Sequence, residues 1–397
     1  MTPLPALAGV KIVEFAHVIA GPLAGTLMAD LGADVVHVED PRRGDPGRHQ
    51  GPAKDGVHLW WKVSARNKRS VTLDLRSEEG QEVARELVRW ADVVITNFRV
   101  DTLRKWGLDW AAVHELNPRA VMLQITGNGV TSSAYNEPGF GKVGEARSGV
   151  VHVTGFPDGP PVHTGFSHAD TCTALMGAFA VSAALVRRGD PDFDGEWIDL
   201  ALFETLFRLV EWQVIFYDQF GVAPQRAGNQ LAVAPGAVVN TYLTSDDVWI
   251  TVTSATLRSV QNIAELLGEP MSNYQTAAQQ AEHKSRLDQL LTRWIGSRTA
   301  DECLQAMAAL EVVASRIYDA ADIVADKTYQ ERGDIITVAD PDLGQVRMQA
   351  VVPMLHQRPG SVWRVGPRLG EDNDLVYGQW LRMPTERITA LRDQGVI

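Results

Sequence analysis

The sequence predicts an α/β protein, in which a large domain is built on a parallel sheet with helices on both faces and a smaller α+β domain is added. Short runs of β-branched and apolar residues recur between residues 10 and 200. Stretches with helical spacing separate these runs, as expected when parallel strands are joined by crossover helices. The pattern changes near Gly221, where a hairpin-like stretch is followed by helices.

In the first part of the chain, buried strands are expected wherever a short apolar run lies between turn signals. These strands are Val10–Phe15, Ala33–Val38, Ser70–Leu75, Asp92–Thr96, Ala120–Thr126 and Trp197–Leu200. The helices between them are expected at Pro22–Leu31, from Ser77 to about Trp90, and at Asp170–Arg187. Ser77 is the expected cap of its helix because acidic residues follow it in the first turn.

Three further stretches complete the pattern. The segment from Asn128 to Pro161 is rich in Gly, Ser and Pro and is expected to be a long loop with turns, where functional sites often lie. Ala201–Phe220 has the spacing of one long amphipathic helix. The segment NTYLTSDDVWITV predicts a hairpin that turns at Asp246-Asp247, and helices are expected at Leu257–Leu267, Ser285–Ser297 and Ala300–Leu310.

The expected organisation is therefore a large domain over residues 1–221, a small domain over 222–330 and a tail over 331–397. The tail contains short strands, a crossing rich in Pro and Gly near Pro359–Gly370 and a helix at Pro384–Gln394. A chain of 397 residues is too long for one simple core, which agrees with this division.

Composition restricts the possible functions. The net charge of −12 argues against a general nucleic-acid binder, because neutralising phosphates requires clustered Lys and Arg. Cys172 and Cys303 form neither a CxxC motif nor a Cys/His cluster, so no metal site is expected. We expect no membrane span, because no apolar run approaches the ~20 residues that one needs, and no signal peptide, because the N-terminus lacks that pattern. We expect a cytoplasmic protein that binds neither nucleic acid nor membranes.

The opening segment VKIVEFAHVIAGPLAGTLMADLGADVVHVED has the order of a dinucleotide-binding unit: strand, glycine-containing turn, helix, strand, acid. Its glycines do not fit, because Gly21 and Gly25 give GxxxG where the fingerprint is GxGxxG. We therefore expect no nicotinamide or flavin cofactor. The glycines serve either close packing or the close approach of a phosphate-bearing ligand, and the sequence leaves both open.

Asp170 follows a glycine turn, in the segment HTGFSHADTCTALMG, and begins a helix. One interpretation is an N-cap, since Asp is a preferred capping residue. The other is a carboxylate nucleophile, kept ionised by the helix N-terminus and close to backbone N–H groups that can hold an oxyanion. Position alone does not choose between them, and His163 and His168 nearby are weak evidence for metal.

Basic residues gather around the strand at Ser70–Leu75 and after Asn97-Phe98. They are either solvated surface charges or the walls of a groove for an anionic cofactor, with Lys and Arg for phosphates and Phe98 for a planar ring. His17, on the glycine-containing loop, is either a hydrogen-bonded loop residue or a ligand contact. The basic residues are Arg42, Arg43, Arg66, Lys68, Arg69, Arg76, Arg104 and Lys105.

Six segments in order, spanning essentially the whole chain, resemble the family III CoA-transferases. This group contains formyl-CoA:oxalate CoA-transferase, carnitine CoA-transferase and the α-methylacyl-CoA racemases. Besides the opening segment and the Asp170 segment, they are NKRSVTLDLRSEEGQE, ADVVITNFRVDTLRKWGLDW, ELNPRAVMLQITG and GEWIDLALFETL. Each segment alone is modest, whereas six in this order are highly specific.

The resemblance implies a fold and a mechanism. A large domain combines the N-terminal part with the C-terminal tail, and two chains are interlocked as a homodimer. An acyl-CoA donor and a small carboxylic acid acceptor are the implied substrates. The carboxylate matching Asp170 attacks the donor thioester to give a mixed anhydride, then an aspartyl-CoA thioester, and CoA finally passes to the acceptor.

The resemblance also implies where CoA binds. The expected contacts come from the loop after the first strand, the strand and loop near Arg76, the pair after the next strand and basic phosphate contacts. These residues are His17, Val18, Ile19, Ala20, Arg43, Leu73, Arg76, Asn97, Phe98 and Lys105. The expected acid-substrate residues lie on the segment GFGKVGEARSG and are Phe140, Gly141, Glu145 and Arg147.

Departures from the family pattern exclude some of the reactions and substrates known in the family. The formyl-CoA:oxalate branch has Gln in place of Ile19, Glu in place of Gly141 and a flap of four glycines where this chain has QLAVAPGAVVN. Oxalate and formyl-CoA are therefore poor candidates. The racemase branch needs a His where this chain has Phe140, which disfavours racemisation. The alternatives kept are an acyl-CoA racemase or isomerase and a non-catalytic CoA-binding protein, while succinyl-CoA and a mid-sized organic acid are the default substrates.

Overall fold

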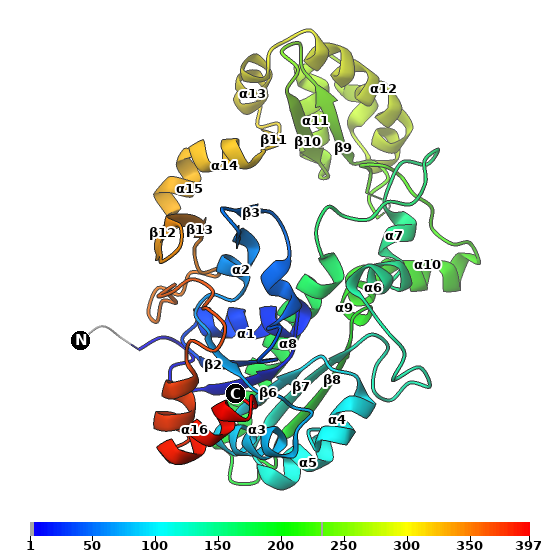
Figure 1. Cartoon of the computed structure of the whole chain (residues 1–397). Helices are drawn as coiled ribbons and strands as arrows, with labels where there is room; N and C mark the ends of the chain where they lie inside the picture. Colours follow the sequence, from blue (N-terminus) through cyan, green and yellow to red (C-terminus); the bar gives the residue numbers. More distant parts are fainter. Residues whose placement is uncertain (1–3, 232) are drawn as a thin grey trace. The chain divides into compact units, whose positions relative to one another are not determined.

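The computed structural model describes residues 4–231 and 233–397; the first three residues of the predicted large domain and position 232 lie outside it. The chain forms two compact units (Figure 1). Among the described residues, unit 1 contains 4–148, 164–209 and 328–397, and unit 2 contains 149–163, 210–231 and 233–327. The chain passes between the units at 148/149, 163/164, 209/210 and 327/328. The prediction from the sequence has boundaries at 221/222 and 330/331 and leaves 149–163 in the large domain.

Unit 1 is built on a parallel six-stranded sheet with the strand order β5-β2-β1-β6-β7-β8. Each strand pairs in parallel with its neighbours, and each coincides within a few residues with a strand expected from the sequence. The strands are β1 (Lys11–Phe15), β2 (Asp34–Glu39), β5 (Arg69–Thr72), β6 (Val93–Thr96), β7 (Val121–Thr126) and β8 (Glu196–Ala201).

Helices cover both faces of this sheet, as predicted, because each strand has apolar side chains on both sides. One face packs on α1 (Ala20–Asp30) and α8 (His168–Val186). The other packs on α3 (Glu78–Trp90), α4 (Val100–Trp106), α5 (Trp110–Leu116), the π-helix η4 (Asp374–Trp380) and α16 (Thr385–Asp393). The C-terminal tail thereby contributes to the core of unit 1.

Smaller elements complete unit 1. A hairpin of β3 (Ala53–Lys54) and β4 (Val57–His58) precedes α2 (Leu59–Ser64), and the tail adds an antiparallel pair, β12 (Ile335–Asp340) and β13 (Gly344–Gln349). The turn η1 (Pro46–His49) follows β2, and η2 (Arg187–Gly189) follows α8. The remaining helices of this unit are α6 (Gly141–Arg147), α9 (Glu204–Leu209) and α15 (Lys327–Arg332), whose first residue falls in unit 2.

Unit 2 contains an antiparallel sheet in the order β11-β10-β9, with its own apolar core. The predicted hairpin is confirmed: β9 (Val238–Leu243) pairs with β10 (Trp249–Ser254), and Asp247 adopts a positive φ of 59° at the turn. The other elements are α7 (Val150–Val153), α10 (Trp212–Phe220), α11 (Leu257–Leu266), η3 (Met271–Tyr274), α12 (Ala277–Gly296), α13 (Ala300–Ala309), β11 (Ala314–Arg316) and α14 (Ala320–Ala325).

Two sequence expectations about helices were wrong. The stretch 128–161 is not only loop, because it contains α6 and α7. Ala201–Phe220 is not one helix: β8 runs to Ala201, and α9 and α10 are separate. The Glu204 carboxylate accepts a hydrogen bond from the Ala201 N–H at 2.7 Å, which stabilises a new helix start after the strand.

The expectation about apolar length was also wrong. In the described part of the chain, one helix, spanning His168–Gly189 with a mean hydropathy of 1.5, is long and apolar enough to cross a membrane by length and composition. In this structure it packs along the sheet, with Ala174 and Val181 fully buried. Gly177 lies so close to Leu123 of β7 that a Cβ would come within 2.7 Å of that side chain. Only 28% of this apolar stretch is buried, so one side of the helix packs on the sheet and the other side is exposed.

The expected cap at Ser77 is present. Its hydroxyl accepts a hydrogen bond from the Gly80 N–H at 3.0 Å, and Glu78 and Glu79 lie in the first turn of α3. Ser77→Ala should therefore lower the free energy of unfolding by about 1 kcal/mol, because a helix N–H loses its partner. Urea denaturation measures this change, and Ser77→Asn, which keeps a capping oxygen, should lose much less.

Candidate active site

The loops after β1 and β6 lie side by side at the carboxyl edge of the sheet. β1 and β6 are neighbours, and the strand order runs outward from them in opposite directions, so this position is the switch point where open α/β sheets bind ligands. The Asn97 side chain joins the loops: its Oδ1 accepts from the His17 N–H at 3.0 Å and its Nδ2 donates to the His17 carbonyl at 2.8 Å. His17 also packs on Phe98, with ring centroids 5.0 Å apart.

A cavity of about 340 Å³ opens beside these loops. Five predicted CoA contacts line it: His17, Arg43, Leu73, Arg76 and Phe98. Its walls combine aromatic rings, such as Phe98 at 5.2 Å from Trp106, with two arginines and four carboxylates. The rings suit a planar base and an arginine suits a phosphate.

The two arginines of this cavity differ in their partners. Arg76 forms ion pairs with Asp74 at 2.7 Å and Asp40 at 2.9 Å. Within the described residues, no carboxylate pairs with the exposed Arg43. Arg43 is therefore the basic group of this wall that is best placed to take a phosphate.

Two further cavities adjoin the same loops. One, of about 340 Å³, is lined by His17, Asn97, Phe98 and Phe140 among others. The other, of about 500 Å³, is lined by Val18 and Ile19 and by Ser167 and Thr171, which flank Asp170 in sequence. The segment 17–19 thus borders all three cavities, and the predicted CoA loop leads toward the start of α8.

Asp170 lies in the first turn of α8. The helix begins at His168 and its N-cap position is Ser167, so Asp170 is the third helical residue and the capping interpretation is wrong. Among the described residues, no other residue's side chain donates a hydrogen bond to its carboxylate. The carboxylate lies against Gly141: a Cβ at that glycine would come within 1.9 Å of Asp170 Oδ2.

The surroundings of Asp170 raise its pKa to about 6. Burial is the main cause, because it disfavours the charged form, and the nearby carboxylate of Glu145 adds to it. The backbone N–H of Asp170 and the ammonium of Lys142 act in the opposite direction. At neutral pH the carboxylate is mostly ionised yet poorly solvated, which suits a nucleophile.

Glu145, predicted to contact the acid substrate, is buried beside the start of α8. Its carboxylate accepts from the His168 N–H at 3.1 Å and from Lys142 Nζ at 2.9 and 3.0 Å. Lys142 also donates to the carbonyls of Thr164 and Phe166. Glu145 therefore ties the loop before α8 to α6 and places a negative charge near Asp170.

The other predicted substrate residues are spread along the same helix. Phe140 precedes α6 and is 75% exposed. Gly141 is buried under Asp170. The Arg147 guanidinium lies over the ring of Phe203 at 4.8 Å and donates a hydrogen bond to Asn128. Which of these residues contacts the acid stays a prediction.

Two predicted CoA residues lie away from the cavity walls. Lys105 is exposed on α4 and does not line any of these three cavities. Ala20 is buried as the first residue of α1. Whether either residue contacts CoA stays a prediction.

Arg66 and Lys68 fit neither interpretation offered for the basic residues. Both are buried, so they are not solvated surface charges, and both are already paired. Arg66 binds Asp30 at 2.6 Å and Lys68 binds Glu14 at 2.8 Å. These pairs join α1 and β1 to the segment before β5, and leave neither cation for a phosphate.

The two glycines of α1 serve packing. A Cβ at Gly21 would lie 2.7 Å from the Ala16 Cβ, and one at Gly25 would lie 1.5 Å from Glu14 Oε1. Both glycines let the helix approach strand β1 and the residue after it. This decides between the alternatives that the sequence left open.

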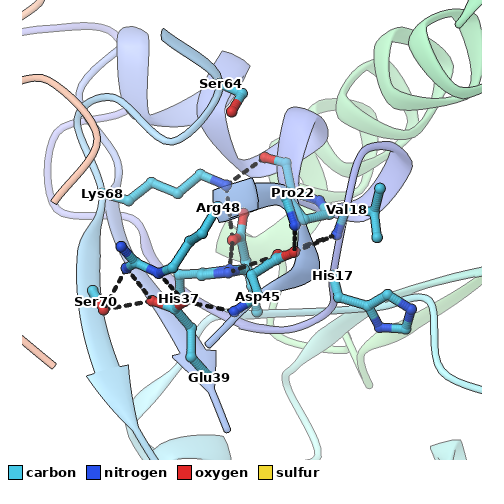
Figure 2. A network of polar contacts seen from close by, with 12 residues as sticks. His17, Val18, Pro22, His37, Glu39, Asp45, Arg48, Ser64, Lys68 and Ser70 are labelled. Carbon is cyan, nitrogen blue, oxygen red and sulfur yellow. Dashed lines mark hydrogen bonds and ion pairs between the residues drawn. The ribbon is translucent and has the colours of Figure 1, made fainter. Parts of the chain in front are cut away.

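A buried network of polar groups beneath the loop was missed from the sequence (Figure 2). It includes Glu14, His37 and Asp45, all less than 4% exposed. Polar residues inside the buried strand runs IVEF and VVHVE were the available signal, because a charge in a core strand needs a partner. Among residues 4–231 and 233–397, no group of three His, Cys, Asp or Glu could hold a metal ion.

A family model described as CoA-transferase family III matches residues 7–373. The chain belongs to CoA-transferase family III. It is similar to succinyl-CoA–D-citramalate CoA-transferase of Chloroflexus aurantiacus, with 37% identity over 397 residues, covering 98% of each chain. It is 33% identical to succinate–glutarate CoA-transferase of Agrobacterium fabrum, covering 94% of this chain and 96% of the relative.

A solved structure has the same fold. The CAIB/BAIF family protein from Brucella suis superposes with a TM-score of 0.82 at 30% identity, covering 95% of this chain and all of the other. The family III CoA-transferase is therefore an enzyme of acyl-CoA metabolism that transfers CoA between acyl-CoA and carboxylic acids. The resemblance and the enzyme class expected from the sequence are confirmed.

Proposed function

We propose that this family III CoA-transferase moves CoA from succinyl-CoA to a dicarboxylic acid, with Asp170 as the covalent nucleophile. The assignment of the nucleophile rests on the carboxylate of Asp170, which lies on the first turn of α8, is largely buried and lies against Gly141. Two relatives named for succinyl-CoA–D-citramalate and for succinate–glutarate transfer support the substrate class.

The proposed reaction balances in four steps. The Asp170 carboxylate attacks the succinyl thioester carbonyl and expels CoA thiolate, leaving a mixed anhydride. The thiolate attacks the Asp170 carbonyl, which releases succinate and forms an aspartyl-CoA thioester. The acceptor carboxylate then attacks this thioester, and the expelled thiolate attacks the acceptor carbonyl. The product acyl-CoA leaves, and Asp170 is a carboxylate again.

Positioning rather than proton transfer is the main demand of this chemistry, because every nucleophile and leaving group is an anion. The loops at the switch point support binding of the CoA moiety, with Arg43 for phosphate and Phe98 for the adenine ring. The helix N-terminus at Asp170 favours the oxyanion that forms in each step. Phe140 offers no acid–base group, which argues against the racemase alternative.

Trapping the intermediate tests the proposal. The enzyme is incubated with a panel of acyl-CoAs, quenched with hydroxylamine and digested, and the peptides are analysed by mass spectrometry. We expect a hydroxamate on the peptide containing Asp170 with succinyl-CoA. If no acyl-CoA gives this adduct although CoA binds, the covalent mechanism is excluded.

The rate of transfer should fall as the pH drops through about 6, because protonation of Asp170 removes the nucleophile. Glu145→Gln should move this acid limb to lower pH, since removing the neighbouring negative charge favours ionised Asp170. A pH profile of kcat for both proteins measures the shift. An acid limb that stays in place would show that a different group controls it.

The interlocked homodimer remains part of the proposal. In the single chain, the outer side of α8 exposes large apolar side chains, including Leu175 at 53%, Phe179 at 69% and Val186 at 82%. A monomer seldom leaves such a stripe in water. Analytical ultracentrifugation should give twice the chain mass of 43.5 kDa, and a monomer would contradict the proposal.

A further inference from the structure

His37 lies between two carboxylates in the interior of unit 1. Its Nδ1 is 2.8 Å from Glu14 Oε2, and its Nε2 is 3.1 Å from Asp45 Oδ2. A carboxylate can only accept, so both ring nitrogens must donate, and the ring must carry both protons. The buried His37 is therefore an imidazolium in this arrangement.

The charge count of the cluster supports the same conclusion. The carboxylates of Glu14, Glu39 and Asp45 face the cations Arg48 and Lys68 and the ring of His37. The cluster is neutral only when His37 is protonated. A neutral ring would leave one uncompensated buried negative charge, which is strongly unfavourable.

This cluster holds the backbone of the loop that borders the three cavities. Asp45 accepts from the Val18 N–H at 2.9 and 3.1 Å and from the Gly47 N–H at 2.7 Å. Val18 has a φ of 67°, which is a costly conformation for a β-branched residue. The same cluster reaches the start of α1, because Lys68 donates to the carbonyl of Pro22.

We propose that His37 is a positioning residue for CoA binding, which through Asp45 holds Val18 in the left-handed conformation that shapes the segment 17–19. The role of this segment in CoA binding rests on the proposed function. The stabilisation of the Val18 backbone by Asp45, called the hold on Val18 below, does not rest on it, because it is a property of the unliganded chain. His37 itself does not line the three cavities and acts only through Asp45.

Several charged or titratable groups face His37 from the elements packed around it. Glu14 comes from β1, Glu39 from β2 itself and Asp45 from the loop after it, and Lys68 pairs with Glu14 from the segment before β5. The other neighbours are His17, the ring of Trp61 at 5.9 Å and Arg48, which lies over Trp61 and pairs with Glu39. The pKa of His17 is lowered mainly by burial and also by the charge of His37.

The pKa of His37 is raised to about 9, because hydrogen bonds and charges from these carboxylates outweigh the burial that would lower it. A raised folded-state pKa stabilises the fold fully below the unfolded value near 6.5, and this contribution is lost as the pH rises through about 9. The hold on Val18 should weaken over the same range.

His37→Gln is the first test, because Gln keeps a donor for one carboxylate and removes the charge. Hydrogen exchange of the peptide containing Val18 in the unliganded protein should become about tenfold faster or more, and the KM for acyl-CoA should rise by a similar factor with kcat changed much less. The double variant His37→Gln/Glu14→Gln restores neutrality and should recover much of both losses.

Asp92→Asn is the matched control. Asp92 pairs with Arg188 and accepts from the Lys11 N–H at 2.9 Å, at the amino ends of the strands and away from the loops of the site. This variant loses a partly buried ion pair but should leave exchange at Val18 and the KM unchanged. If it raises the KM as His37→Gln does, the effect is general destabilisation and the proposal is overturned.

The unmutated enzyme provides a test if His37→Gln does not fold. Exchange at Val18, corrected for the intrinsic pH dependence, should accelerate between pH 8 and pH 10, and the KM should rise with it. Unchanged exchange at Val18, in His37→Gln or at pH 10, would overturn the positioning role. If the unmutated protein binds no acyl-CoA at pH 8 while exchange at Val18 still accelerates between pH 8 and pH 10, the contact of Asp45 with Val18 is upheld and the proposed function is refuted.

Discussion

Asp170→Asn should abolish CoA transfer, lowering kcat by about four orders of magnitude or more, because the amide cannot form the anhydride or the aspartyl thioester. No hydroxamate should form at position 170 after incubation with succinyl-CoA and hydroxylamine. Steady-state kinetics and mass spectrometry of the same preparation measure both effects. A variant that keeps even about 1% of the activity would exclude Asp170 as the nucleophile.

The same variant should be at least as stable as the original protein above pH 6. Because the pKa of Asp170 is raised to about 6 by burial and by Glu145, its ionised form is disfavoured in the folded state. The resulting loss of stability is absent below the unfolded value of 3.8, develops as the pH rises from 3.8 to about 6 and is complete above that pH. Asn carries no charge and avoids this loss.

Thermal unfolding at pH 5 and pH 8 separates catalysis from folding. We expect the difference in Tm between Asp170→Asn and the original enzyme to be larger, in favour of Asn, at pH 8. A markedly lower Tm at pH 8 would mean that the carboxylate of Asp170 is needed for the fold. The loss of activity could then not be assigned to chemistry.

Sequence reasoning predicted the elements whose cause is local. Ser77 caps α3 through a hydrogen bond to a residue three positions away, and the turn at Asp246-Asp247 joins adjacent strands. The expected helix over 201–220 failed because apolar spacing continued across a break. That break depends on the strand pairing of Ala201 with Thr126, which periodicity in one segment does not reveal.

The site was predicted in part, and the part that was missed depends on contacts far apart in sequence. Arg66 pairs with Asp30 across 36 positions and Lys68 with Glu14 across 54, so no local pattern could indicate that these cations are paired. His37 meets Glu14 and Asp45 only after β1 and β2 are placed side by side. The family resemblance indicated which loops form the site. It did not indicate the buried ion pairs that stabilise these loops.

Gly141→Ala is the second substitution for which we expect a large effect. The Cα of Gly141 lies beneath the nucleophile, and a Cβ there would come within 1.9 Å of Asp170 Oδ2 and 2.7 Å of Cγ. Asp170 is fixed on the first turn of α8 and cannot retreat without changing the direction of its carboxylate. Gly141→Ala should therefore displace the carboxylate by an ångström or so and lower kcat by about 10²-fold.

This substitution should lower kcat without lowering the stability of the fold. Ala favours a helix more than Gly does, so α6 itself should not be weakened. The resemblance also places a Glu at this position in the formyl-CoA:oxalate branch, so the fold accepts a Cβ here when the nucleophile is held differently. We expect the Tm of Gly141→Ala to stay within a few degrees of the original while kcat falls.

Gly189→Ala is the control for a glycine replacement at the far end of α8, since a Cβ there meets nothing within 4 Å. Its kcat should be unchanged. Hydroxylamine trapping then locates the defect in Gly141→Ala: a slower appearance of the hydroxamate at Asp170 means that attack on the thioester is impaired. If Gly141→Ala keeps kcat within about twofold, the close approach of Gly141 does not set the position of the nucleophile, because a displaced carboxylate would lose far more.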